Sequence, residues 1–359
     1  MDAVLFVAGT FDRNGGKPST IGAQIFARFY EVFSKSELLL VNGGTYPGDL
    51  DKAIQFAGGC KFVVWMASVS NDEPRKYVTE VKSASPQCIL TTSKRVVEKD
   101  YQLVDVLERA LRTKSNLTVE FSGERNEYKA RVVDPLGNVW VNYTENFGSV
   151  GEFLATKMLD LASVTRVSST SIGAAVEVPN EEQFFKFVQQ KAKEFDTMIP
   201  KPKKRNRFLG NSSFRCQRGF PSFRRNGLIF VSRRNVSKSF IRPEGFVAVK
   251  TATIPVEFYG TKKPSVDTPV QVLLYEHFPK INYMIHGHTY VKDAPTTKIM
   301  VPCGGLQEAD EVIAVVGDPN VACFAVNLRG HGSIIGVGNV HTFDWFEHIP
   351  KPFPEYMQQ

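Results

Sequence analysis

Short apolar runs alternate with longer amphipathic stretches in the first half of the chain. The apolar runs are typical of buried β-strands, and the amphipathic stretches have helical spacing. This alternation predicts βαβ units and a parallel, doubly wound α/β sheet of the Rossmann or flavodoxin kind. The expected strands are residues 3–8, 38–41, 62–66, 88–91 and 117–121, and the expected helices are 19–33, 50–57, 74–84 and 101–112.

A hairpin turn at 134–138 and a helix over 150–161 are expected to complete this first domain. The residues that follow are rich in Ser, Thr and Gly, which is typical of a linker. We therefore expect a first domain over residues 1–165, a linker over 166–178 and a second domain over 179–359.

The first expected strand runs into a glycine-rich segment, residues 9–19. Free backbone N–H groups at such a turn, at the positive end of a helix, can bind an anion. The segment has neither Walker A nor GxGxxG spacing, so an ordinary turn is the alternative. Loops at 42–45, 68–72 and 91–95 add hydroxyls, amides and cations at the same edge. They suit a nucleotide- or sugar-binding domain, although such residues also occur in plain turns.

In the second half, His286 and His288 follow the apolar run 281–285. Residues two apart on a strand point to the same face, so both rings could contact one metal ion. His331 follows in the segment 328–332. Three neutral imidazoles with an open coordination position are typical of a catalytic zinc site. From the spacing alone, a chance pair of histidines remains the alternative.

Composition narrows the class of protein. The chain has 359 residues, 42% of them hydrophobic, which is ordinary for a globular protein. It has no apolar run long enough for a membrane span, and its first residues are expected to form a strand rather than a signal peptide. A cytoplasmic location with reduced thiols is expected, because the cysteines are scattered and odd in number. They are Cys60, Cys88, Cys216, Cys303 and Cys323.

The net charge of +7 favours anionic partners. Cations concentrate between residues 201 and 234, where three readings stay open: nucleic-acid binding, a rim around a phosphate ester, or a solvated loop. We expect no membrane partner, and we leave nucleic acid as a less favoured partner. The cations are Lys201, Lys203, Lys204, Arg205, Arg207, Arg215, Arg218, Arg224, Arg225, Arg233 and Arg234.

Four motifs, taken in order, make residues 179–345 resemble the class II aldolase and adducin family, the fold of L-fuculose-phosphate aldolase. They are similar to the family's phosphate-binding turn, its Pro-Ser-Ser-Glu segment, its His-x-His pair and its third-ligand His-Gly. The resemblance implies an α/β/α domain with a mainly antiparallel sheet. The motifs are Gly210-Asn211-Ser212-Ser213, Pro264-Ser265-Val266-Asp267, His286-Gly287-His288 and Leu328-Arg329-Gly330-His331-Gly332.

The resemblance implies that His286, His288 and His331 bind a divalent metal, most often zinc. It gives Asp267 the place of the family's general acid and base. Glu308 is a second candidate base, with an ordinary surface acid as its alternative. The expected activity is that of a metal-dependent lyase of the aldolase type, acting on a sugar phosphate or a similar anionic polyol. The expected assembly is a homo-oligomer, with a tetramer as one option.

The sequence also departs from the family pattern. Asp267 replaces a Glu, which is one methylene longer, and the family's Ser-Gly phosphate loop is here Ser232-Arg233-Arg234. Bidentate arginine contacts could replace the lost glycine. Two further functions therefore stay open: a non-catalytic, adducin-like binding module, and a dehydratase or epimerase of the same fold. The expected phosphate-binding residues are Gly210, Asn211, Ser212, Ser232, Arg233, Arg234 and Ser265.

Overall fold

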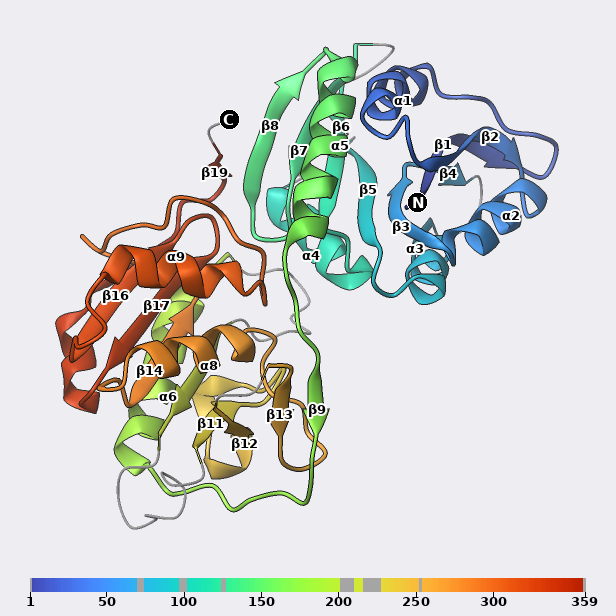
Figure 1. Ribbon diagram of the computed structural model, residues 1–359. Helices are drawn as coiled ribbons and strands as arrows, with labels where there is room; N and C mark the ends of the chain where they lie inside the picture. The colour runs from blue at the N-terminus through green and yellow to red at the C-terminus, as the bar shows by residue number, and fades with distance from the viewer. Residues whose placement is uncertain are drawn as a thin grey trace. The chain divides into compact units, whose positions relative to one another are not determined.

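The computed structural model describes residues 2–69, 74–96, 102–123, 127–200, 210–215, 227–251 and 254–357. The described residues form two compact units. The first contains the chain up to Ser163 and its last described residues from Phe353 onward, and the second contains the residues from Val164 to Pro352 (Figure 1). Among the described helices, none has both the length and the apolar character needed to cross a membrane.

The first unit contains a mixed sheet with a parallel centre. Its strand order is β19-β8-β7-β6-β5-β3-β1-β2, with β4 paired to β1. The long parallel strands are β1 (Ala3–Asp12), β2 (Glu37–Thr45), β3 (Cys60–Trp65), β5 (Ile89–Val96) and β6 (Leu117–Ser122). The others are β4 (Ser68–Val69), β7 (Lys129–Val133), β8 (Asn138–Thr144) and β19 (Glu355–Tyr356). The strands β7 and β8 form the antiparallel hairpin expected at 134–138.

Helices cover both faces of this sheet, which confirms the doubly wound α/β class. Along β1, Phe6 faces one core with α1 and α5, while the next residue along, Val7, faces the other with α2 and α3. This alternation follows from the period of two in a strand. The helices are α1 (Thr20–Val32), α2 (Gly48–Ala57), α3 (Pro74–Ala84), α4 (Leu103–Thr113) and α5 (Phe147–Ser163).

In the glycine-rich segment 9–19, which begins within β1, most of the amides are engaged, which favours the ordinary turn over the anion site. Its backbone N–H groups already donate within the protein: the Thr10 amide to Lys17 O at 2.9 Å, and the Gly16 amide to Gly44 O at 2.8 Å. The expected loop 42–45 is the end of β2. Few amides are left here for an anion. The other donating amides of the segment are those of Asn14, Gly15, Lys17 and Ser19.

The second unit is an α/β/α layer structure, as expected. Its sheet has the order β16-β17-β14-β10-β11-β12-β13-β9, and every pairing except β13–β9 is antiparallel. The strands are β9 (Ser169–Ser171), β10 (Asn211–Phe214), β11 (Leu228–Ser232), β12 (Phe246–Lys250), β13 (Val256–Phe258), β14 (Tyr283–Gly287), β16 (Cys323–Leu328) and β17 (Gly332–Val337). A separate pair joins β15 (Tyr290–Val291) to β18 (His348–Ile349).

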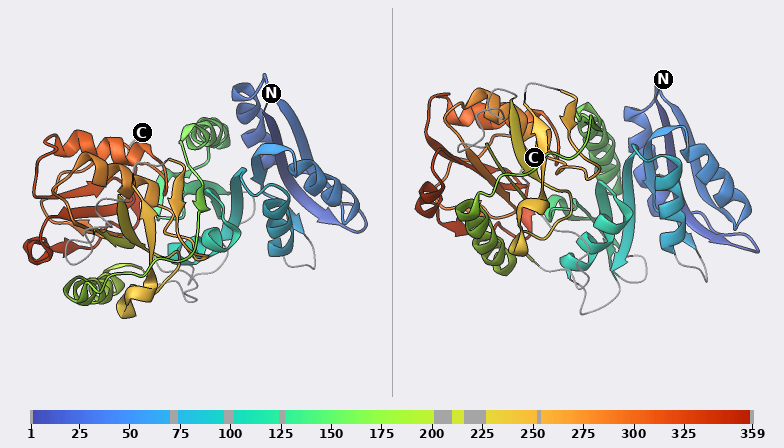
Figure 2. Two further views of the ribbon diagram at one scale, coloured as in Figure 1. Left: turned by 60° about the horizontal axis from the view of Figure 1, so that its bottom comes forward. Right: turned by 90° about the horizontal axis from the view of Figure 1, so that it is seen from below.

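The two faces of this sheet carry different helices. Figure 2 shows α6 (Glu182–Met198) on one side and α8 (Thr268–His277) with α9 (Gln307–Val316) on the other. The α6 face is rich in phenylalanine, and Ile285 of β14 packs there. Met284 packs on the opposite face with α8 and α9. By alternation, His286 shares the face of Met284. Short 3-10 helices cover Lys238–Phe240, Pro243–Gly245 and Val340–Trp345.

Two of the expected domain limits need correction. The expected linker, 166–178, contains β9, whose residues Ser169–Ser171 pair in parallel with β13. The last described residues do not stay with the second unit: β19 pairs with β8, and the Met357 amide donates to Val139 O at 2.9 Å. Both segments are short edge strands of polar or mixed residues, which apolar periodicity does not reveal.

His348 lies in the tail strand β18 and is buried. Its ring packs edge-on against Phe195 at 4.5 Å between centroids, and its Nδ1 lies 3.2 Å from Thr289 Oγ1. Burial lowers the pKa of His348 to about 3. The unfolded value is about 6.5. The folded protein therefore binds fewer protons between these values, so this histidine stabilises the fold above pH 6.5 and loses that contribution as the pH falls towards 3.

We expect the substitution His348→Gln to reduce the acid sensitivity of the fold. Between pH 7 and pH 5, the wild type should lose about 2 kcal/mol more unfolding free energy than the variant does. Urea unfolding at the two pH values measures this difference. His341→Gln is the matched control, because His341 is exposed in the same tail. Equal losses in the wild type and in His348→Gln would contradict the prediction.

Candidate metal centre

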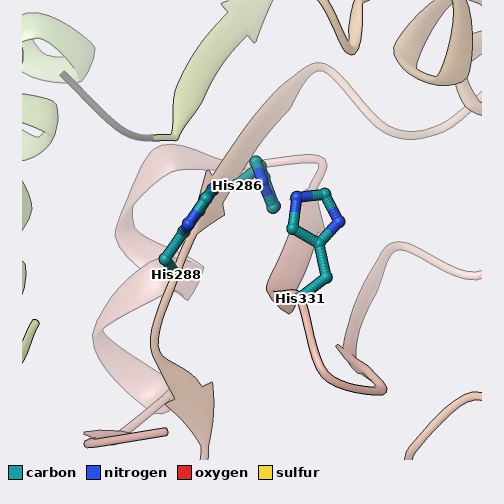
Figure 3. A group of neighbouring side chains, drawn as sticks. All are labelled: His286, His288 and His331. Carbon is teal, nitrogen blue, oxygen red and sulfur yellow. The ribbon is translucent and has the colours of Figure 1, made fainter. Parts of the chain in front are cut away.

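The three expected histidine ligands come together at one end of β14 and β17. His286 lies in β14, His288 directly follows that strand, and His331 lies in the turn between β16 and β17. Their ring centroids are 5.2 Å, 4.7 Å and 5.1 Å apart. One nitrogen of each ring lies within 4.8 Å of the others, and Figure 3 shows the rings gathered around one point. The arrangement is suited to a single metal ion.

The hydrogen bonds of His286 fix which nitrogen can bind a metal. Its Nδ1 lies 2.9 Å from the carbonyl oxygen of Ser333, which can only accept, so Nδ1 carries the proton. The other nitrogen, Nε2, is buried and has no partner in the protein. A lone pair on a buried, unpartnered nitrogen that faces two other imidazoles is what a metal ligand requires.

His331 is oriented by a carboxylate. Its Nδ1 donates to Glu308 Oε1 at 2.6 Å, and both side chains are buried. Glu308 belongs to the first turn of α9. A carboxylate behind a metal-binding histidine fixes the ring and increases its basicity. The structure thus places Glu308 behind His331, and its near oxygen is already engaged. The sequence suggested Glu308 as a candidate catalytic base, but its Oε1 is bonded to His331 Nδ1.

The pKa values of the three histidines depend on burial and on the neighbouring ionisable groups. Burial, reinforced by the neighbouring His331, lowers the pKa of His286 to about 4. Burial likewise sets the pKa of His288 well below its usual value. Burial also opposes the charged form of His331, but Cys303 and Glu308, which face its two nitrogens, raise its pKa well above the usual range. Near pH 7 two of the imidazoles are therefore neutral and able to bind a cation.

Asp267 faces the same centre from the start of α8. Its Oδ2 accepts from Asn211 Nδ2 at 3.2 Å, and Asn211 Oδ1 accepts a hydrogen bond from Gln271 Nε2. The second oxygen, Oδ1, is buried without a partner. Asp267 and His331 each have a ligand atom within 4.8 Å of one another. The carboxylate therefore lies beside His331.

A small pocket, with room for about one water molecule, lies against His286, Asp267 and Glu308. Polar side chains form one part of its lining and aliphatic side chains the rest. The polar lining residues are Asn211, Asp267, Gln271, His286 and Glu308. The aliphatic ones are Val270, Val312, Leu328 and Ile334.

The expected phosphate-binding residues lie near β10 and β11, but not as a nest of free amides. Asn211 begins strand β10 rather than a turn, and Gly210 precedes it with φ 74°. The Ser212 amide donates to Ser232 Oγ at 3.1 Å, and the Ser265 amide donates to Ser232 O. The amides of Arg233 and Arg234 are also engaged, with Gly245 O and Lys263 O. Two side-chain atoms are available to an anion: Ser212 Oγ and Arg233 Nε are both buried, with no hydrogen-bond partner among the described residues.

Two comparisons of sequence bear on the second unit. Residues 203–326 match the class II aldolase and adducin N-terminal domain. The matched residues all belong to the second unit, apart from 203 and 204, which lie outside the described residues. This confirms the resemblance carried by the motifs. A methylthioribulose-1-phosphate dehydratase from a Picosynechococcus species is 40% identical over 62 residues, which are 17% of this chain and 29% of that protein. The matched part is thus less than a third of this relative's length.

Solved structures are similar at low identity. An L-fuculose 1-phosphate aldolase is 14% identical, with a TM-score of 0.32 over 47% of this chain and 84% of that one. A DNA/pantothenate metabolism flavoprotein from Streptococcus pneumoniae is 13% identical, with a TM-score of 0.34 over 45% of this chain and 99% of that one.

Two residues of the class II aldolase domain were not singled out from the sequence. Cys303 Sγ lies 3.1 Å from His331 Nε2. Lys238 is buried, and burial lowers its pKa to about 8, while the charge of Asp267 opposes that shift. Neither residue belongs to a recognisable sequence motif. Cys303 is more than 25 positions from His331, and Lys238 is more than 25 positions from Asp267. Of the expected cations, Lys201, Lys203, Lys204, Arg205, Arg207, Arg218, Arg224 and Arg225 lie outside the described residues.

We expect Glu308→Gln to weaken metal binding about 10- to 100-fold, because the amide holds His331 less firmly than the carboxylate does. Competition with a chromogenic chelator measures the zinc affinity. Asp310→Asn is the control, since Asp310 is exposed on the same first turn of α9. Unchanged affinity in Glu308→Gln would show that the contact with His331 plays no part in metal binding.

Proposed function

We propose that the second unit is a metal-dependent lyase that acts on a small anionic polyol such as a sugar phosphate. The observation that supports this most strongly is the convergence of three imidazoles, with a carboxylate oxygen of Asp267 within 4.8 Å of one of them, His331. A metal site alone would suit a binding protein. A buried carboxylate oxygen that is free to exchange a proton beside that site suits catalysis.

The donor set fits a divalent cation of the zinc type. Three imidazole nitrogens with an open side are typical of catalytic zinc sites. The buried, unpartnered Nε2 of His286 is the clearest sign, because a lone pair withdrawn from water is costly unless something binds it. A divalent metal bound by these residues would supply Lewis acidity toward a carbonyl or hydroxyl oxygen of the substrate.

Asp267 is the residue that we assign to proton transfer. Its Oδ2 is fixed by Asn211, which Gln271 holds in turn, so Oδ1 keeps a defined direction. That oxygen could take a proton from the substrate and return it to a product. Glu308 acts on His331 and is therefore a positioning residue. Lys238 contributes a positive charge that favours an anionic substrate.

Two lyase reactions use this set of groups. In aldol cleavage, the base takes a hydroxyl proton and a C–C bond breaks. In dehydration, the base takes a proton from the carbon beside a carbonyl, the C–O bond to the neighbouring hydroxyl breaks, and water leaves. The similarity to a protein described as a methylthioribulose-1-phosphate dehydratase favours dehydration as the second candidate. The side chains of Ser212, Ser232, Ser265, Arg233 and Arg234 are the proposed donors to a phosphate group.

Two other functions are less well supported. A non-catalytic, adducin-like module would not require Asp267 to face the histidines. A nucleic-acid-binding protein would depend on cations that mostly lie outside the described residues, so its test is the salt dependence of binding. Assembly as a homo-oligomer and a cytoplasmic location remain predictions from the sequence.

The test is turnover by zinc- or manganese-loaded protein with L-fuculose 1-phosphate and with methylthioribulose 1-phosphate. We expect the wild-type protein to consume one of these two substrates. In Asp267→Asn, we expect kcat to fall about 10²- to 10⁴-fold while the metal content stays unchanged. His286→Ala should lose both metal and turnover. Asp310→Asn serves as the control variant. If the wild type retains no metal, or if Asp267→Asn turns substrate over at the wild-type rate, the proposal fails.

A further inference from the structure

Cys303 contacts the metal-facing nitrogen of His331. The Nδ1 of this histidine is taken by Glu308, so Nε2 is the atom left for a metal. Cys303 Sγ lies 3.1 Å from that Nε2. Sγ also lies within 4.8 Å of a carboxylate oxygen of Asp267. The thiol thus stands beside His331, the histidine that the two groups of possible ligands, His286–His288–His331 and Asp267–Cys303–His331, have in common.

The spacing suits two ligands on one ion. Zinc binds nitrogen at about 2.05 Å and sulfur at about 2.3 Å, so two such ligands at a tetrahedral angle lie about 3.6 Å apart. The observed separation of 3.1 Å requires only a small movement. His286 adds an independent indication, because its Nε2 is buried and lacks a partner. Three nitrogens and one sulfur make a complete tetrahedral set.

The backbone holds Cys303 in place. The turn after it is closed by a hydrogen bond from the Gly305 amide to Pro302 O at 3.0 Å. Gly304 has φ 77°, and a Cβ there would lie 2.9 Å from Val266 Cγ1, so the chain passes closely over the segment that carries Asp267. Arg166 Nε donates to the carbonyl oxygen of Cys303 at 3.4 Å. Sγ is therefore directed at His331 by the local fold.

We propose that Cys303 is a fourth, thiolate ligand of the metal. The inference rests on the proposed metal site. On metal binding, the S–H bond of Cys303 and the N–H bond at His331 Nε2 would break, a metal–sulfur and a metal–nitrogen bond would form, and both protons would pass to the solvent. The soft sulfur favours zinc or cobalt over manganese and magnesium.

The absorption spectrum of the cobalt(II)-substituted protein tests the proposal without an assay of activity. A thiolate ligand gives an intense near-ultraviolet charge-transfer band, and imidazole ligands do not. We expect wild-type protein to bind one cobalt per chain with that band. Cys303→Ser should bind cobalt through the histidines, keep the visible bands of the metal and lose the charge-transfer band. Its preference for zinc over manganese should fall by about tenfold or more.

Cys323→Ser is the matched control. Cys323 lies at the start of β16, five residues from the strand end at Leu328, so its thiol is about 16 Å or more along the strand from the site. This variant should keep the band. Iodoacetamide labelling followed by mass spectrometry gives a second readout: zinc should protect Cys303 and leave the labelling of Cys323 unchanged.

The outcomes separate the two proposals. Wild-type protein that binds no cobalt would overturn the metal site and, with it, the proposed function. Cobalt bound without a charge-transfer band, a band that persists in Cys303→Ser, or rapid alkylation of Cys303 in the zinc-loaded protein would each overturn only the role of Cys303. If Cys303→Ser does not fold, the zinc protection of the wild-type thiol decides.

Discussion

The register of β14 between its two neighbours is the constraint on which the site depends. His286 pairs with Asn211 of β10 on one side and with Ile334 of β17 on the other. A shift by one residue would turn His286 toward the phenylalanine-rich face and put Ile285 in the pocket. The apolar partners of Met284 and Ile285 on opposite faces oppose that shift, since each face already has its own core. The core thus selects the direction of the His286 ring.

Close approaches of backbone hold this register at the end where the histidines lie. Gly210 has φ 74°, and a Cβ on it would lie 2.5 Å from the carbonyl oxygen of His286. A Cβ on Gly332 would lie 2.1 Å from Gly287 O. Side chains at these two positions would push β10 and β17 away from β14. Each buried polar atom that lost its partner in this way would cost about 1–3 kcal/mol. The two glycines therefore support the pocket without contacting a ligand.

The sequence predicted the outline of the site because its strongest signal is local. A His-x-His pair on an apolar strand places both rings on the same face of the sheet. The structure shows His286 and His288 in that arrangement. The roles of Glu308 and Cys303 depend on contacts with His331 across 23 and 28 residues, and no local pattern reports them. The segment 9–19 left an anion site and an ordinary turn open for a related reason. Glycines suggested free amides, but the chain folds back so that the amides bond to Lys17 and Gly44.

The shorter acid at position 267 fits a particular helix start. An Asp at the N-cap usually accepts from the backbone amides of the first turn. Asp267 makes no such bond, and one of those amides is missing because Pro269 occupies the first turn. The carboxylate is thus less committed to the helix and bonds to Asn211 through Oδ2. The proline removes one amide that could otherwise hold the carboxylate at the helix start, so the start of α8 and the contact with Asn211 depend on the same two residues, Asp267 and Pro269.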